Sequence, residues 1–149
     1  MHEIQVRSLT MALEHWERLF SLVLAKDVEG LMKEGWGGKQ CQCCRDFFDK
    51  GRRNTLCTGC PIKEYTGCTG CGKTPYEEAE HSLDEIESTE YHEIDGITPN
   101  LWINAALNVK AEVMFLSIVL DNLLDPNAPP KTLDPNWYIQ TNTSDEATE

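Results

Sequence analysis

The sequence predicts a mainly α-helical fold in which three helices pack around a loop-rich segment inserted between the first helix and the second. Apolar residues recur at steps of three and four in three separate stretches. All seven cysteines instead lie between Cys41 and Cys71, where that periodicity is absent. The 149 residues suit one domain, predicted over 1–125, and the Pro-, Asp- and Thr-rich residues 126–149 are predicted to form a mostly disordered tail.

The first helix is predicted over 3–32. Its apolar residues share one face because their spacing alternates between three and four, and they are Leu9, Leu13, Trp16, Phe20 and Val23. Gly35, followed by Gly37 and Gly38, favours chain reversal over a further helical turn. We therefore expect one long amphipathic helix that ends before these glycines.

The second helix is predicted over 75–92, where Thr74 is the N-cap, Pro75 the first helical residue and Glu77 completes a capping box. Its apolar residues form a narrow stripe, so the remaining surface is strongly acidic. The predicted acidic face comprises Glu77, Glu78, Glu80, Asp84, Glu85, Glu87 and Glu90.

The third helix is predicted over 99–124 and begins with a second N-cap pair, Thr98-Pro99. This stretch is the most apolar in the chain, but Lys110 and Glu112 interrupt it. We therefore expect a helix in the core of the domain and not a membrane span.

The cysteines form three pairs with two residues between the partners: Cys41/Cys44, Cys57/Cys60 and Cys68/Cys71. Two thiolates at this spacing reach one tetrahedral ion from a single tight turn. The turns Cys57-Thr-Gly-Cys60 and Cys68-Thr-Gly-Cys71 are typical of zinc knuckles, so residues 39–73 are predicted to hold one or two zinc ions. Because this segment has few apolar residues, metal binding, worth about 10 kcal/mol for structural zinc, is expected to drive its folding.

The residues leave the ligand set open. Cys41, Cys44, Cys57 and Cys60 make the best single site, and Cys68 with Cys71 is a competing or second pair. An iron–sulfur cluster is less favoured, since such clusters usually take four thiolates in a tighter run. Cys43 is expected to be a buried or idle thiol. Residues 1–20 lack the pattern of a signal peptide, which predicts a cytoplasmic protein, and reducing conditions there favour metal over disulfides.

Several of these motifs occur together in small cysteine-cluster proteins of tailed phages, whose function is not known, and the chain resembles them. The shared elements are His15-Trp16, Cys41/Cys44, Cys57-x-x-Cys60-Pro61, Cys68 and a final helix with alternating small and large apolar residues, here 105–124. Cys43, Cys71 and the acidic helix depart from the pattern. The resemblance implies a phage-encoded accessory protein made in the host cytoplasm, and it implies no particular activity.

The net charge of −12 combines two opposite regions: residues 33–73 hold eight basic and four acidic side chains, whereas residues 74–149 hold two and sixteen. The first functional hypothesis is a non-catalytic protein that binds and modulates or inhibits a host protein, with the acidic helix imitating a nucleic-acid backbone. A merely solvated acidic face is the simpler interpretation. Self-association is a further way to cover apolar helix surface.

The alternative is a zinc-dependent nucleic-acid-binding regulator that uses the basic cysteine segment. Its contact residues would be Lys39, Arg45, Lys50, Arg52, Arg53 and Lys63. The isoelectric point near 4.7 argues against it, because the downstream carboxylates oppose the approach of phosphate.

A third possibility is nucleotide binding, because residues 67–74 match the P-loop pattern G-x4-G-K-[ST] and 117–121 resemble a strand with a magnesium-binding aspartate. A P-loop must follow a buried strand, however, and residues 61–66 do not have the pattern of one. His2, His15, His81 and His92 are expected to be surface or packing residues, and no catalytic constellation is visible in the spacing, so we do not expect an enzyme.

Overall fold

The computed structural model describes residues 2–37, 40–47, 57, 59–66, 74–92 and 96–129 of the chain. Within these ranges the chain is mainly helical and has no strand, which confirms the predicted fold class at that level. Six helices are present where three were predicted. They are α1 (His2–Leu24), α2 (Val28–Glu34), α3 (Gln42–Phe47), α4 (Pro61–Thr66), α5 (Tyr76–His92) and α6 (Pro99–Leu124).

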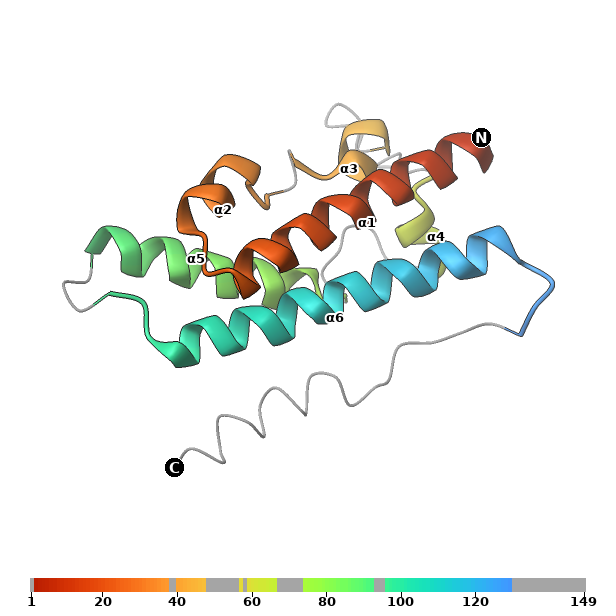
Figure 1. Ribbon diagram of the computed structural model, residues 1–149. Coiled ribbons are helices and arrows are strands. Elements are labelled where there is room, and N and C mark those ends of the chain that lie inside the picture. The colour runs from red at the N-terminus through yellow and green to blue at the C-terminus, as the bar shows by residue number, and fades with distance from the viewer. Residues whose placement is uncertain are drawn as a thin grey trace.

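Three long helices, α1, α5 and α6, form what we call the scaffold. Figure 1 shows α1 and α6 side by side with opposite chain directions, and α5 packs against α6 beyond the C-terminal end of α1. Their apolar faces meet in one core, as their spacing predicts. Its fully buried side chains include Leu9, Trp16, Leu19, Leu83, Ile86, Val109 and Leu116.

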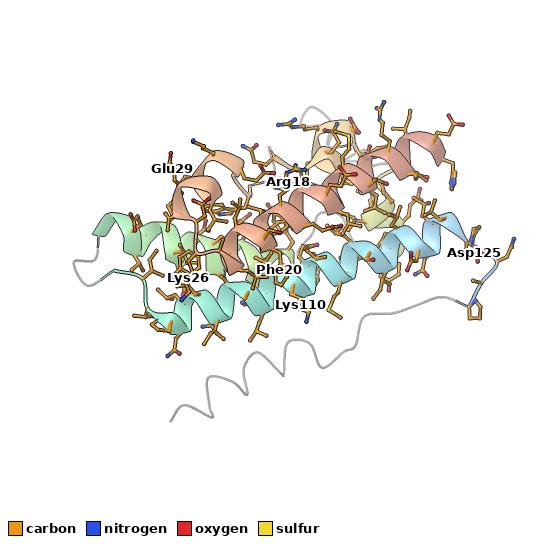
Figure 2. All side chains as sticks on the ribbon, viewed as in Figure 1. Arg18, Phe20, Lys26, Glu29, Lys110 and Asp125 are labelled. Carbon is orange, nitrogen blue, oxygen red and sulfur yellow. The ribbon has the colours of Figure 1, made fainter. Side chains whose placement is uncertain are left out.

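A single helix was expected over 3–32, but the structure divides this stretch into α1 and α2 at Lys26 (Figure 2). The α1 terminus is a Schellman motif, since Lys26 N donates to Val23 O and Asp27 N donates to Leu22 O, both at 3.0 Å. Lys26 occupies the left-handed position of this motif with φ 53°. Because that position usually takes glycine, a lysine there does not signal the end of a helix.

A new N-cap then starts α2. Asp27 Oδ1 accepts a hydrogen bond of 2.9 Å from Gly30 N, one of the donors that the first turn of a helix leaves unpaired. A β-carbon on Gly30 would lie 2.6 Å from the Asp27 carboxylate and from the Leu22 side chain. Glycine therefore lets α2 turn back closely on the end of α1.

The predicted starts of α5 and α6 agree with the structure. Thr74 Oγ1 accepts from Tyr76 N at 3.2 Å ahead of α5, and Thr98 Oγ1 accepts from Leu101 N at 3.4 Å ahead of α6. By length and hydropathy, α6 is the one helix in the described ranges that could cross a membrane. A core helix passes the same test, and α6 packs against both α1 and α5, as expected of a core helix.

Trp36 connects the end of α2 to α5. Its side chain is buried, and its indole Nε1 donates a 2.8 Å hydrogen bond to Asp84 Oδ1 on α5. The Tyr76 hydroxyl donates back to Trp36 O at 3.4 Å. Buried tryptophan and tyrosine usually find such partners for their polar atoms. These bonds fix the chain at the point where the cysteine-containing residues begin.

Candidate functional site

The cysteine segment, residues 39–73, is described at 40–47, 57 and 59–66. It was expected to be loop-rich, but two helices of six residues, α3 and α4, lie within it. Figure 1 shows α3 over α1 and α4 beside α6, so the segment contacts both of these long helices. Isolated helices this short are unstable in water, so their order depends on contacts with the rest of the molecule.

Two polar side chains of α1 hold this segment in place. Gln5 Nε2 donates to Gly59 O at 2.7 Å and to Glu64 Oε2 at 3.1 Å, and the Ser8 hydroxyl donates to Asp46 of α3. Both are buried on the same face of α1 as the apolar core residues. The sequence analysis did not single them out, although polar residues at i and i+3 on an otherwise apolar stripe are a recognisable signal of buried hydrogen bonds.

Four thiols come together between the two short helices. Cys43 is 1% exposed and lies within hydrogen-bonding reach of the Cys41 and Cys60 sulfurs, and Cys41 also interacts with Cys44. Cys41, Cys44 and Cys60 belong to the predicted ligand set. Cys43 was expected to be idle, yet it lies at the centre of this group. Cys43 is one of the two residues between Cys41 and Cys44 and lies on the first turn of α3, so the three thiols are close together.

The hydrogen bonds shift the pKa values of these thiols in opposite directions. Hydrogen bonds from Cys43 and Cys44 lower the pKa of Cys41 to about 3, and one from Cys43 lowers the pKa of Cys60 to about 7. The same bonds to Cys41 and Cys60, together with burial, raise the pKa of Cys43. Thiolates are the form of cysteine that binds metals and attacks electrophiles, and Cys41 is the thiol of this group that ionises most readily.

Cys57 lies one tight turn before Cys60, whose N–H donates to Cys57 O at 2.9 Å. Cys57 has φ 61°, a conformation that non-glycine residues rarely adopt, and its side chain is buried. The five cysteines of the described ranges form no disulfide, and no group of three or more His, Cys, Asp or Glu side chains there is arranged to hold a metal ion. Cys68 and Cys71 lie outside the described residues.

Glu112 is a buried carboxylate of α6. It is 2% exposed, and no described residue is hydrogen-bonded to its Oε2 atom. Burial, with a smaller contribution from the negative charge of Cys41, raises the pKa of Glu112 to about 8. The sequence analysis treated Glu112 only as an interruption of an apolar helix. Its place among core residues 109, 115 and 116 was the signal that could have singled it out.

The acidic face of α5 is only partly free for other contacts. Asp84 accepts a hydrogen bond from Trp36. Burial raises the pKa of the Tyr76 hydroxyl, and a hydrogen bond with Glu80 raises it further. The Ser82 hydroxyl donates a 2.9 Å hydrogen bond to the Glu78 backbone carbonyl. The same hydroxyl oxygen accepts a 2.6 Å hydrogen bond from Asn108 Nδ2 on α6. The most exposed carboxylates of the face are Glu77, Asp84, Glu85 and Glu90.

The basic face proposed as an alternative is described at two positions only. Arg45 is exposed on α3 and Lys63 is half-buried on α4, whereas Lys39, Lys50, Arg52 and Arg53 lie outside the described residues. The P-loop pattern at 67–74 is described only at Thr74. The residues before it form α4 and residues 117–121 lie in α6, so neither place has the strand that a P-loop needs.

Among the histidines, His15 is buried while His2 and His81 are exposed, and the side chain of His92 is not described. His15 Nδ1 donates to Glu34 Oε1 at 2.7 Å, and Arg18 Nε donates to the same oxygen at 2.8 Å. Burial raises the pKa of Glu34, but these two partners outweigh it and hold the pKa below its usual value. His15 therefore joins α1 to α2, which is the packing role expected of it.

No family model, no curated protein and no solved structure gives a significant match to the chain.

Proposed function

We propose that the chain is a non-catalytic protein in which zinc staples the cysteine segment to the helical scaffold and the acidic face of α5 docks on a partner protein. The observation that carries this proposal is the convergence of Cys41, Cys43, Cys44 and Cys60 between α3 and α4. Thiolates are soft donors, for which zinc is the common partner in a reducing compartment. The resemblance to tailed-phage proteins makes a host protein the partner that we propose, with host takeover or anti-defence as the outcome.

The fold of the segment supports a structural role for the metal. Its described helices are six residues long, and the hydrogen bonds of Gln5 and Ser8 join them to α1 beside the apolar contacts of Ile62 and the buried cysteines. A structural zinc contributes free energy of about 10 kcal/mol, far more than such bonds. Thiolates held by a structural zinc are poor nucleophiles, which agrees with a protein that binds and does not catalyse.

The acidic face supports the docking role. Its exposed carboxylates lie on one helix whose opposite side is fixed against α6 by Leu83, Ile86 and the Ser82–Asn108 hydrogen bond. A rigid array of negative charge complements a basic groove and steers a partner to it.

Native mass spectrometry with elemental analysis tests the metal. We expect one or two zinc ions per chain, and loss of at least one when Cys41→Ser and Cys60→Ser are combined. Removal of zinc by a chelator should raise amide exchange at 41–66 while α1, α5 and α6 keep their helical signal. Iron with labile sulfide, or no bound metal after purification in the presence of zinc, would overturn the proposal.

Charge reversal tests the docking face. Glu85→Lys combined with Glu90→Lys should abolish the capture of a host protein by the chain. High salt should likewise weaken the binding of this host protein to the wild-type chain. Glu14→Lys with Glu17→Lys makes the same change of net charge on an exposed part of α1 and is the matched control. Equal retention of the partner by both variants would place the contact elsewhere.

A further inference from the structure

The side of α6 that faces away from the core carries four large apolar residues in contact with solvent. They are Ile103, Leu107, Met114 and Leu124, each between 37% and 58% exposed. Figure 2 shows Lys110 on this side of the helix, pointing away from α1. Isolated exposed apolar residues are common on protein surfaces, but several of them aligned along one helix indicate a binding surface.

These residues follow the spacing of a coiled coil. Alternating steps of four and three residues along α6 define one stripe, which we call the α6 seam and which consists of Ile103, Leu107, Lys110, Met114, Ser117, Asp121 and Leu124. Ser117 is half-buried and the other six are exposed, whereas Ala105, Glu112 and Val119 lie on the opposite side of the helix and are buried. A stripe with this period can follow a second helix over its whole length, here about 32 Å.

The two charged residues of the seam indicate which helix covers it. When a second copy of α6 lies antiparallel with its Leu124 opposite Leu107, its Asp121 lies opposite Lys110 and its Ser117 lies opposite Met114. Two-fold symmetry then repeats each of these pairs. A parallel pair in register would instead set each lysine against a lysine and each aspartate against an aspartate. The seam is therefore complementary to its own antiparallel copy in both charge and spacing.

A lipid surface and the C-terminal residues of the chain fit the seam less well. The length and hydropathy of α6 would allow it to cross a membrane, but Lys110 and Asp121 are costly against hydrocarbon. The large apolar residues of 130–149 are Leu133 and the consecutive run 137–139, which does not have the spacing of the seam. A second copy of α6 matches both the apolar and the charged positions.

We propose that the α6 seam is the interface of an antiparallel homodimer, in which Lys110 of each copy pairs with Asp121 of the other. Burial of Leu107, Met114 and Leu124 supplies the attraction between the copies. A polar pair within such a seam lowers stability but fixes register and orientation. The inference goes beyond the proposed function, because it concerns a surface that neither the cysteine segment nor the acidic face of α5 includes.

Charge reversal at the two positions tests the dimer by sedimentation equilibrium of the full chain. The wild-type protein should have twice the 16.9 kDa mass of one chain. Lys110→Glu and Asp121→Lys each set like charges against one another in both pairs, so each should raise the dimer dissociation constant by at least about 10-fold. Arg7→Glu makes the same change of charge as Lys110→Glu at an exposed position of α1 and should leave the constant unchanged.

Mixing the two weakened variants is the decisive step. A heterodimer of Lys110→Glu with Asp121→Lys has opposite charges in both pairs, so mixing should restore association, which a variant that merely fails to fold cannot do. Dimers of undiminished affinity in both variants, or no heterodimer on mixing, would overturn the inference. So would a wild-type chain that stays monomeric at about 100 μM, or one that binds phosphatidylcholine vesicles as a monomer.

Discussion

The scaffold and the cysteine segment are stabilised in different ways. Side chains such as Leu9, Leu83 and Val109 are fully buried where α1, α5 and α6 meet, so the hydrophobic effect holds the scaffold together. The described cysteine segment contributes Ile62 and its buried cysteines to the same apolar core, and it adds hydrogen bonds to Gln5 and Ser8 of α1. The comparison teaches that short helices can join a core built by long helices through a few buried side chains and polar contacts.

Trp16→Ala should have the largest effect, because it damages the scaffold itself. Trp16 is 1% exposed and makes edge-to-face contacts with His15 and Tyr76. Its loss should lower the free energy of unfolding by about 3–5 kcal/mol in urea denaturation, through lost burial and the cavity left behind. Ile103→Ala, at a side chain 52% exposed, is the control and should cost less than about 1 kcal/mol. Comparable losses in the two variants would contradict a core centred on Trp16.

Gln5→Ala should have a smaller and local effect. It removes the donor that serves Gly59 O and Glu64, which leaves the buried carbonyl unpaired, so opening of residues 57–66 should become easier by about 1–3 kcal/mol. Native-state hydrogen exchange measures this, with α5 as the internal reference.

Gln42→Ala is the matched control for Gln5, because Gln42 makes an exposed bond of 3.0 Å to Asp46 within α3. We expect it to change exchange by less than about 0.5 kcal/mol. If Gln5→Ala destabilised α5 and residues 57–66 equally, the two regions would unfold as one unit and the distinction between them would fail.

Lys26→Gly should have the smallest effect and the opposite sign. It relieves the strain of the left-handed conformation at the end of α1. After the entropy cost of glycine, we expect the free energy of unfolding to rise by about 0.5–1 kcal/mol, measured by urea denaturation. Lys33→Gly, in α2, lacks that relief and should destabilise. A loss of stability in both variants would show that Lys26 makes a contribution other than its backbone conformation.

The sequence predicted the parts of the fold that depend on periodicity and capping. The bounds of α6 and the start of α5 agree with the structure because Thr98-Pro99 and Thr74-Pro75 satisfy backbone donors locally. The break at Lys26 was missed because a lysine occupies a position that glycine normally marks. The helices α3 and α4 were missed because six residues are too few to display a hydrophobic period.

The candidate site was predicted in part. Spacing alone pointed to Cys41, Cys44, Cys57 and Cys60, and the structure brings Cys41, Cys44 and Cys60 together. The central place of Cys43 and the burial of Glu112 arise from tertiary packing, which no local pattern records. Whether zinc is the ion, and which protein α5 meets, remain the proposals made above.

The pairing of α1 with α6 also sets an order of events during synthesis. Leu24 ends α1, and Pro99 begins α6 75 residues later. Because synthesis proceeds at about 5–20 residues per second, roughly 4–15 s pass between the synthesis of α1 and that of the helix that covers its apolar face. The thiols around Cys41 and Cys60 leave the ribosome within that interval. The zinc binding that we propose would therefore take place on the nascent chain, before α6 is available to cover α1.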